Sequence, residues 1–347
     1  MSKKRNETLS VFKCISIYAV ILAHVPFPGQ FGRALCALAK FSVVVFFLSS
    51  GYFSWEKSGT ALKRSAGKTG SLLIKVVLFH LAVGCFNAVR EGTSAVDFLL
   101  ERFHPLYIKE TLLYQVLSLP YSWHLWFLTS LLVVYILWWA MTAWLERRGG
   151  RVPYGALGVL AVVLLGINIA LGEGRAMIGL TPLPNLQLRN AWLDAFPCFA
   201  LGSLLREKEA ALLPRLKLPL LWGGTAACVV LNLWEFSRVD VVDVFLGTTV
   251  LAVLLMLIAM KHPQAPRNLL IRWACYCGDR LTFYIYVIHV PMYCLMKFNG
   301  GAVLGPEGLL SHRWLTPVAI ALLSTLLAVC FDRLAQLRPK GVKGARQ

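Results

Sequence analysis

Residues 9–26, LSVFKCISIYAVILAHVP, decide the fold class, because they form an apolar run long enough to cross a bilayer as a helix. Two ionisable residues interrupt the run, Lys13 near its start and His24 near its end. They are eleven positions apart, about three helical turns, so both side chains project from one face roughly 16 Å apart. We therefore expect one polar face on an otherwise apolar helix.

Ionisable side chains inside a bilayer are costly, and they normally face a cavity and mark a pathway or a reaction. The alternative for this pair is that Lys13 snorkels to the headgroups while His24 sits at the opposite interface. Because the two residues share a helix face, we favour a functional site, with Lys13 and His24 as its catalytic candidates.

The composition indicates an integral membrane protein. Of the 347 residues, 57% are hydrophobic and only 15% are charged, with a mean hydropathy of +0.64, whereas about one quarter of the residues in soluble domains are charged. The formal net charge of +18 would suit a nucleic-acid partner. Basic residues in short loops between apolar spans are instead the usual mark of membrane orientation, so we expect no nucleic acid.

The apolar stretches predict an all-α membrane protein of about ten transmembrane helices, each near the length of about 20 residues that a span needs. The predicted spans are approximately 9–26, 35–55, 69–89, 123–145, 152–172, 190–206, 215–234, 241–260, 277–298 and 315–336.

The loop charges predict the orientation of these spans. With the amino terminus inside, every inner segment is at least as rich in lysine and arginine as its outer neighbours, so both termini are predicted to be cytoplasmic. The basic start followed by an apolar run is also typical of a signal peptide. Lys13 interrupts that run and no small-x-small site follows, so we expect the first span to be retained.

The nine cysteines predict neither a disulfide framework nor a metal site. Most of them lie inside apolar segments, where they act as small buried hydrophobes. Cys275 and Cys277 form a C-x-C pair without the second cluster that a zinc site needs, so no metal is expected.

Small residues within two spans and regularly spaced apolar residues in a loop each predict how a segment packs. Ser49, Ser50 and Gly51 in the second span, and Gly202 and Ser203 in the sixth, allow close helix approach and hydrogen bonds between helices. The long outer segment 90–122 has apolar residues at helical spacing, which predicts an amphipathic helix on the outer surface beside a substrate entrance.

A basic stripe follows the second span. Arg64 and Lys68 stack on one face at the start of the third span, and Lys75 extends that face into the membrane. Such a stripe binds lipid headgroups or the phosphates of a soluble cofactor, and the depth of Lys75 is harder to explain by lipid contact alone. His80 lies deeper in the same span, and that position is equally consistent with a structural and with a functional histidine.

Further candidates for substrate binding lie near the outer ends of other spans. His124 and Trp126 open the fourth span, where tryptophans usually anchor helices, and Arg189 and Asn190 open the sixth.

His289, a further candidate for substrate binding, lies about midway across the ninth span. A proton relay, a substrate contact and a core histidine with one backbone hydrogen bond are all consistent with that position.

The order of these features resembles the acyltransferase 3 family of multi-spanning membrane acyltransferases over nearly the whole chain. The matching pieces are Lys13 and His24, FFLSSGYF at 46–53, WHLWFL at 123–128, RNAWLDAFPCFALG at 189–202 and IYVIH at 285–289. The resemblance implies a single membrane domain over 1–347 in a bacterial inner membrane. Only about ten residues follow the last predicted span, so we expect no fused soluble domain.

The resemblance also implies the chemistry. Family members transfer an acyl group, typically acetyl, from cytoplasmic acyl-CoA to a hydroxyl of an envelope sugar or a similar, including lipid-linked, acceptor. The family's basic residue and histidine fall on Lys13 and His24, and its second basic pair on Arg64 and Lys68. Whether His24 acts as a base or is transiently acylated stays open.

Two positions depart from the family pattern. Ser10 stands where an acidic residue is common, and the basic pair is Arg-x-x-x-Lys rather than Arg-x-x-Arg. The alternative from a different class is a proton-coupled transporter or a flippase of a lipid-linked sugar, which would use the same membrane histidines. Against it, the chain shows no repeat between its halves and no paired broken helices.

Overall fold

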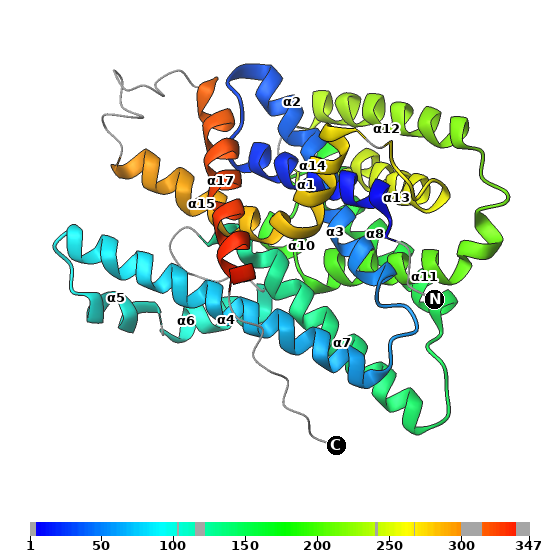
Figure 1. Ribbon diagram of the computed structural model, residues 1–347, viewed down its shortest axis with the longest axis horizontal. Helices are drawn as coiled ribbons and strands as arrows, with labels where there is room; N and C mark the ends of the chain where they lie inside the picture. The colour runs from blue at the N-terminus through cyan, green and yellow to red at the C-terminus, as the bar shows by residue number, and fades with distance from the viewer. Residues whose placement is uncertain are drawn as a thin grey trace.

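The computed structural model describes residues 5–102, 104–114, 122–239, 242–266, 268–299 and 314–337, and within these ranges the chain is helical without a strand (Figure 1). The first half comprises α1 (Glu7–His24), α2 (Gly29–Ala39), α3 (Phe41–Tyr52), α4 (Gly59–Arg90), α5 (Ala95–Arg102), α6 (Pro105–Tyr114), η1 (Trp123–Leu125), α7 (Trp126–Arg147) and α8 (Tyr154–Ile169). The second half comprises η2 (Ala170–Gly174), α9 (Arg175–Met177), α10 (Asn185–Leu188), η3 (Ala191–Ala195), α11 (Phe196–Leu212), α12 (Leu218–Arg238), α13 (Leu246–Lys261), α14 (Leu269–Tyr276), η4 (Cys277–Leu281), α15 (Thr282–Asn299) and α17 (Leu315–Leu337).

All ten predicted spans fall on helices. Within the described residues, seven helical stretches are long and apolar enough to cross a membrane: Glu7–His24, Gly29–Tyr52, Gly59–Arg90, Trp126–Arg147, Tyr154–Met177, Leu218–Arg238 and Leu315–Leu337. The other three predicted spans fall on α11, α13 and α15, and α13 is apolar but shorter. The all-helical membrane class is therefore supported, while the count of ten and the orientation of the termini stay predictions.

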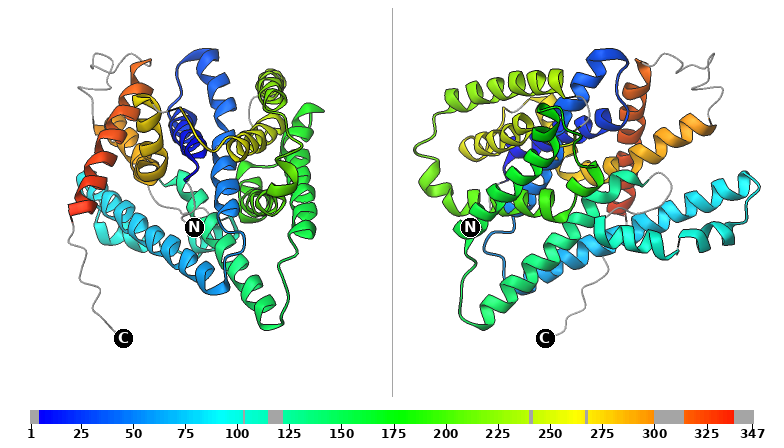
Figure 2. Two further views of the ribbon diagram at one scale, coloured as in Figure 1. Left: turned by 45° about the vertical axis from the view of Figure 1, so that its right-hand side comes forward. Right: turned by 180° about the vertical axis from the view of Figure 1, so that it is seen from behind.

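The segment 90–122, predicted to lie on the outer side, forms two short helices rather than the single amphipathic helix predicted for it. Helix α5 packs on the end of α4 through the buried Phe98, whereas Leu106 in α6 is exposed. Figure 2 shows α5 and α6 folded back beneath the end of α4, which runs beside α7 along one edge of the molecule (Figure 2). Part of the predicted helix, residues 115–121, lies outside the described residues.

Helix α1 is the centre of the fold. It packs against α2 and α3 on one side and against α14, η4, α15 and α17 on the other. Its amino-terminal end is capped by Asn6, whose side chain accepts a hydrogen bond from the backbone N–H of Leu9 at 2.9 Å. Elements from both ends of the chain therefore meet around Lys13 and His24.

Helices α3 and α11 approach each other unusually closely, as their small residues predict. A Cβ added at Gly51 would lie 1.8 Å from the carbonyl oxygen of Phe199, and one added at Gly202 would lie 2.0 Å from that of Leu48. The Ser203 hydroxyl also donates to the Gly51 carbonyl at 2.9 Å. Glycine is required at both positions because any side chain would push the two backbones apart.

Among the described residues, three π-helical turns occur: η2, η3 and η4. Each turn carries an acidic residue: Glu173, Asp194 and Asp279 respectively. Such turns occur frequently at functional sites because they displace a side chain from the regular helical position. Two of the three carboxylates, Asp194 and Asp279, line the cavities described below.

Candidate active site

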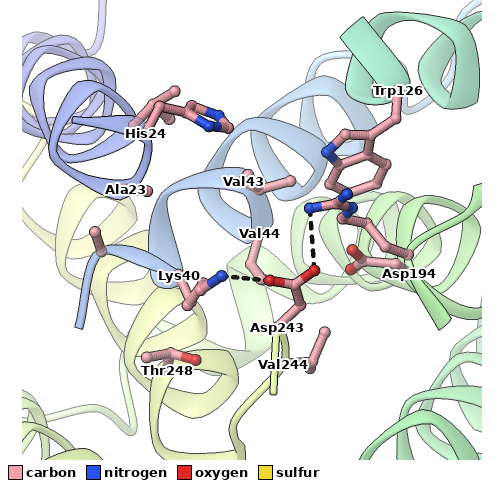
Figure 3. A pocket seen from close by; sticks show the side chains of 13 residues that line it. Ala23, His24, Lys40, Val43, Val44, Trp126, Asp194, Asp243, Val244 and Thr248 are labelled. Carbon is pink, nitrogen blue, oxygen red and sulfur yellow. Dashed lines mark hydrogen bonds and ion pairs between the residues drawn. The ribbon is translucent and has the colours of Figure 1, made fainter. Parts of the chain in front are cut away.

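His24, the last residue of α1, points into a cavity of about 180 Å³, here called the central cavity (Figure 3). The residue as a whole is half-buried, and its imidazole faces Lys40, Asp243 and Trp126 across the opening. The central cavity is lined by Val20, Ala23, His24, Ala39, Lys40, Val43, Val44, Trp126, Arg189, Asp194, Asp243, Val244 and Thr248. A titratable group is thus placed beside space that a ligand can fill.

An ion-pair network forms the wall opposite His24. Lys40, in the turn between α2 and α3, pairs with Oδ1 of Asp243, in the segment that leads into α13. Arg189, which follows α10, places Nη1 at 3.0 Å from Oδ2 of the same carboxylate. The Asp243 side chain is only 10% exposed, and burial of such a carboxylate is tolerated because two cations hold it.

Trp126 and Asp194 complete the polar part of the central cavity. The Arg189 guanidinium carbon lies 5.3 Å from the centroid of the Trp126 ring, a cation–π distance. Asp194, in the π turn η3, is buried, and its Oδ1 accepts a long contact from the Cys198 thiol at 3.8 Å. An indole face beside carboxylates and fixed cations is a surface suited to a polar, hydroxyl-bearing ligand.

Asn190, predicted to bind substrate, caps the π turn η3 in the structure. It is the residue before η3, and its Oδ1 accepts hydrogen bonds from the backbone N–H groups of Trp192 and Leu193, both at 2.9 Å. Its amide nitrogen donates to the Gln187 carbonyl at 2.6 Å. Asn190 therefore shapes the turn that carries Asp194, and it does not line the central cavity.

Three histidines from three other helices converge beside His24. The ring centroid of His24 lies 5.4 Å from that of His289 and 6.2 Å from that of His124. The His124 centroid lies 5.1 Å from that of His289 and 5.7 Å from that of His80. These four rings form the histidine cluster, in which only His24 lines the central cavity.

The other members of the cluster are buried in the bundle. Nδ1 of His289 lies 3.1 Å from the Ile285 carbonyl, while its Nε2 has no hydrogen-bond partner among the described residues. The Tyr286 hydroxyl donates to the backbone carbonyl of His124 at 2.5 Å and fixes that segment. In the part of the chain that the structure describes, no group of three or more His, Cys, Asp or Glu side chains is arranged to hold a metal ion.

A second cavity, of about 490 Å³, lies at the amino-terminal end of α1 and is here called the inner cavity, because that end is predicted to face the cytoplasm. Lys13 lines it and places Nζ 4.9 Å from the centroid of the Phe53 ring. The inner cavity is lined by Arg5, Asn6, Leu9, Ser10, Lys13, Tyr52, Phe53, Arg206, Glu209, Met260, Pro263 and Asp279. The shared face predicted for Lys13 and His24 therefore corresponds to two cavities, one at each end of α1.

The charges of the inner cavity are partly paired. Arg206 pairs with Glu209 and also donates to the Tyr52 hydroxyl at 3.1 Å. Arg5 lies 2.6 Å from Asp279, whose other oxygen accepts from the Ser10 hydroxyl at 2.6 Å. Ser10 therefore stands beside a carboxylate supplied by another helix, at the position where the family commonly has an acidic residue of its own.

The predicted cofactor-binding residues lie apart from both cavities. Arg64, Lys68 and Lys75 are all exposed on α4, and none of them lines the central or the inner cavity. Their neighbour Lys63 lies over the Trp139 ring of α7, with Nζ 5.5 Å from its centroid. The stripe therefore faces outward along the α4–α7 edge rather than toward Lys13.

Lys40, Asp194 and Asp243 are cavity residues that the sequence did not assign to the site. Each is a charged residue within or beside an apolar stretch, which is a signal that could have found them, and Asp194 also lies in the matching piece at 189–202. In the inner cavity, Arg206 lies at the end of its predicted span, and Tyr52 is an uncharged residue of the matching piece at 46–53. Their convergence depends on contacts between distant segments.

The comparisons with known proteins agree with the helical membrane architecture. A family model described as an acyltransferase domain matches residues 6–333, which is nearly the whole chain. Neither the curated proteins nor the solved structures give a match. The matched range contains every residue of both cavities except Arg5.

Proposed function

Because the chain belongs to the acyltransferase 3 family, we propose that it transfers an acyl group, in the first instance acetyl, from cytoplasmic acyl-CoA to a hydroxyl on an acceptor. The proposed acceptor is an envelope sugar, a polysaccharide precursor or a lipid-linked sugar presented at the outer face of a bacterial inner membrane. The family and the seven candidate spans support the coarser statement, a multi-pass membrane acyltransferase.

The observation that carries the proposal is the position of His24, a histidine that borders open space opposite paired cations. An alcohol is a weak nucleophile at neutral pH, and a histidine within hydrogen-bond reach removes its proton as it attacks. In the proposed step the acceptor oxygen bonds to the thioester carbonyl carbon while His24 takes the hydroxyl proton. The carbon–sulfur bond then breaks, and the CoA sulfur leaves with the proton that His24 returns.

The cations of the central cavity supply a second contribution. Negative charge develops on the thioester oxygen during attack, and preformed positive groups stabilise it most effectively in a site that excludes water. Lys40 and Arg189 are held in place by a shared carboxylate, that of Asp243 in this structure, so they need little reorganisation as the charge develops. We propose that one of these cations faces the oxyanion.

The donor is proposed to bind at the inner cavity. Lys13 and Arg206 supply positive charge there for CoA phosphates, and the acyl-bearing arm would extend along α1 toward His24. Both cavities are bordered by α1 and α3, so a donor in one and an acceptor in the other meet along the same helix pair. Arg64 and Lys68 on α4 are the alternative phosphate site.

One observation favours a different class. Four histidines with neighbouring ring centroids 5.1 to 6.2 Å apart suit a proton relay, as a proton-coupled transporter or a flippase of a lipid-linked sugar would require. The family match favours the acyltransferase over this alternative.

Radiolabelled acetyl-CoA separates the two classes. Inverted membrane vesicles that contain the protein expose the predicted cytoplasmic face to the donor, and the label is then followed into lipid-linked and polysaccharide fractions. An acyltransferase releases free CoA thiol and leaves label in one of those fractions, whereas a transporter leaves acetyl-CoA intact. Vesicles with His24→Gln are the matched control, and equal label in both preparations would contradict the proposed reaction.

A further inference from the structure

A third cavity, of about 290 Å³, opens beside the central cavity and is here called the outer cavity. Arg33 and Cys36 of α2, Asn185, Phe236 and Phe245 line it. These residues lie near the end of α1 that carries His24, the end that the loop charges predict to face outward. No residue of the outer cavity has a role in the reaction described so far, apart from the two it shares with the central cavity.

Among the described residues, the linings of the central and outer cavities share only Lys40 and Asp243. Their ion pair is therefore the wall between the outer cavity and the space beside His24. A second contact closes the same boundary, since the Cys36 thiol of the outer cavity lies 3.6 Å from the carbonyl oxygen of Ala23 in the central cavity. Neither cavity alone reaches the roughly 300 Å³ at which ligand pockets begin, whereas the two joined exceed it.

We propose that the outer cavity is the entrance and outer subsite of the acceptor, and that an anionic group of the acceptor takes the place of Asp243 between Lys40 and Arg189. This inference rests on the proposed function. It names the acceptor class more narrowly, as a hydroxyl-bearing compound that also carries a carboxylate or a phosphate.

The preference for an anion follows from the cost of opening the wall. Moving Asp243 away removes the ion-pair partner of two partly buried cations, Lys40 with 24% and Arg189 with 26% of its side chain exposed, and leaves Asp194 as the one other carboxylate lining the central cavity among the described residues. Breaking such a pair is unfavourable unless another charge replaces the lost one. A neutral acceptor supplies no replacement, whereas a carboxylate or phosphate does. Arg33, which also lines the outer cavity, adds positive potential along the approach.

Native Cys36 reports on the outer cavity, and Ala23→Cys in a Cys36→Ser background reports on the central cavity. Intact cells are treated with two membrane-impermeant methanethiosulfonates, one anionic and one cationic. The labelling rate of each cysteine is then divided by the rate at which the same reagent reacts with free 2-mercaptoethanol. We expect Cys36 to react from outside, with the anionic reagent favoured. We expect the cysteine at position 23 to react slowly, because the ion pair covers it.

The decisive variant is Asp243→Asn, which keeps the size of the side chain and removes its charge. The labelling rate at position 23 should rise on the order of tenfold, since a charge-assisted contact is replaced by a weaker one. Asp279→Asn is the matched control, because it makes the same change in the inner cavity and should leave that rate unaltered. Val244→Cys, also in the central cavity, serves as a second reporter if the first variant does not insert correctly.

Three results would overturn the proposal: a Cys36 that reacts only from the cytoplasmic face, a rate at position 23 that is equal with and without Asp243→Asn, or a preference for the cationic reagent. The labelling rates do not depend on acyl transfer. A chain that transfers no acetyl group therefore contradicts the proposed function through the acetyl-CoA assay, while these rates test the acceptor route separately.

Discussion

Replacing Gly202 by alanine tests the close packing of α11 against α3, a helix that borders both the central and the inner cavity. The added Cβ would lie 2.0 Å from the Leu48 carbonyl oxygen, whereas ordinary contacts begin at 3.4 Å, so α3 and α11 must separate by more than an ångström. Overpacking of this kind costs about 1–3 kcal/mol. The separation also weakens the hydrogen bond from Ser203 to Gly51, which contributes about 1 kcal/mol more.

We therefore expect Gly202→Ala to lose about 2–4 kcal/mol of stability. The measurement is thermal unfolding of the purified protein in one detergent, read by fluorescence of a thiol-reactive dye. Gly67→Ala is the matched control, because a Cβ at Gly67 meets nothing within 4 Å and alanine favours the helix α4. If Gly202→Ala unfolds at the same temperature as Gly67→Ala, then α3 and α11 do not pack as closely as described.

Two further predictions concern orientation and the donor. A cysteine at Gly149 should be shielded from an impermeant thiol reagent in intact cells while one at Gly92 reacts, and the reverse pattern would invert the predicted topology. Lys13→Ala should raise the KM for acetyl-CoA on the order of tenfold with a smaller effect on kcat, as loss of a charge-assisted phosphate contact requires. The double variant Arg64→Ala/Lys68→Ala should leave that KM nearly unchanged, and the opposite ranking would move the donor phosphates to α4.

Much of the helical architecture could be predicted, because it depends on local patterns. The lengths of the apolar runs predicted ten spans, and all ten fall on helices in the structure. The small residues around Gly51 and Gly202 predicted close packing of two helices, which the structure confirms. Helical periodicity also placed Lys13 and His24 on one face of α1. It could not show that they border separate cavities, because that depends on which helices pack between them.

The polar contacts between distant segments could not be predicted in the same way. Lys40 and Asp243 are 203 positions apart, and no periodicity within either segment relates them. The convergence of His80, His124 and His289 likewise depends on how three helices pack around α1. The outer amphipathic helix was wrong in detail, since the segment forms α5 and α6 instead of one helix.

The proposed role of His24 in removing the acceptor proton is tested by the rate of radiolabelled acetyl transfer by His24→Gln. His262→Gln is the matched control, because His262 is an exposed histidine after α13 and outside the histidine cluster. We expect His24→Gln to bind CoA as the parent does but to turn over on the order of 10²-fold more slowly or worse, while His262→Gln keeps the parent rate. A correctly inserted His24→Gln protein with the parent rate of acetyl transfer would show that His24 is not the base.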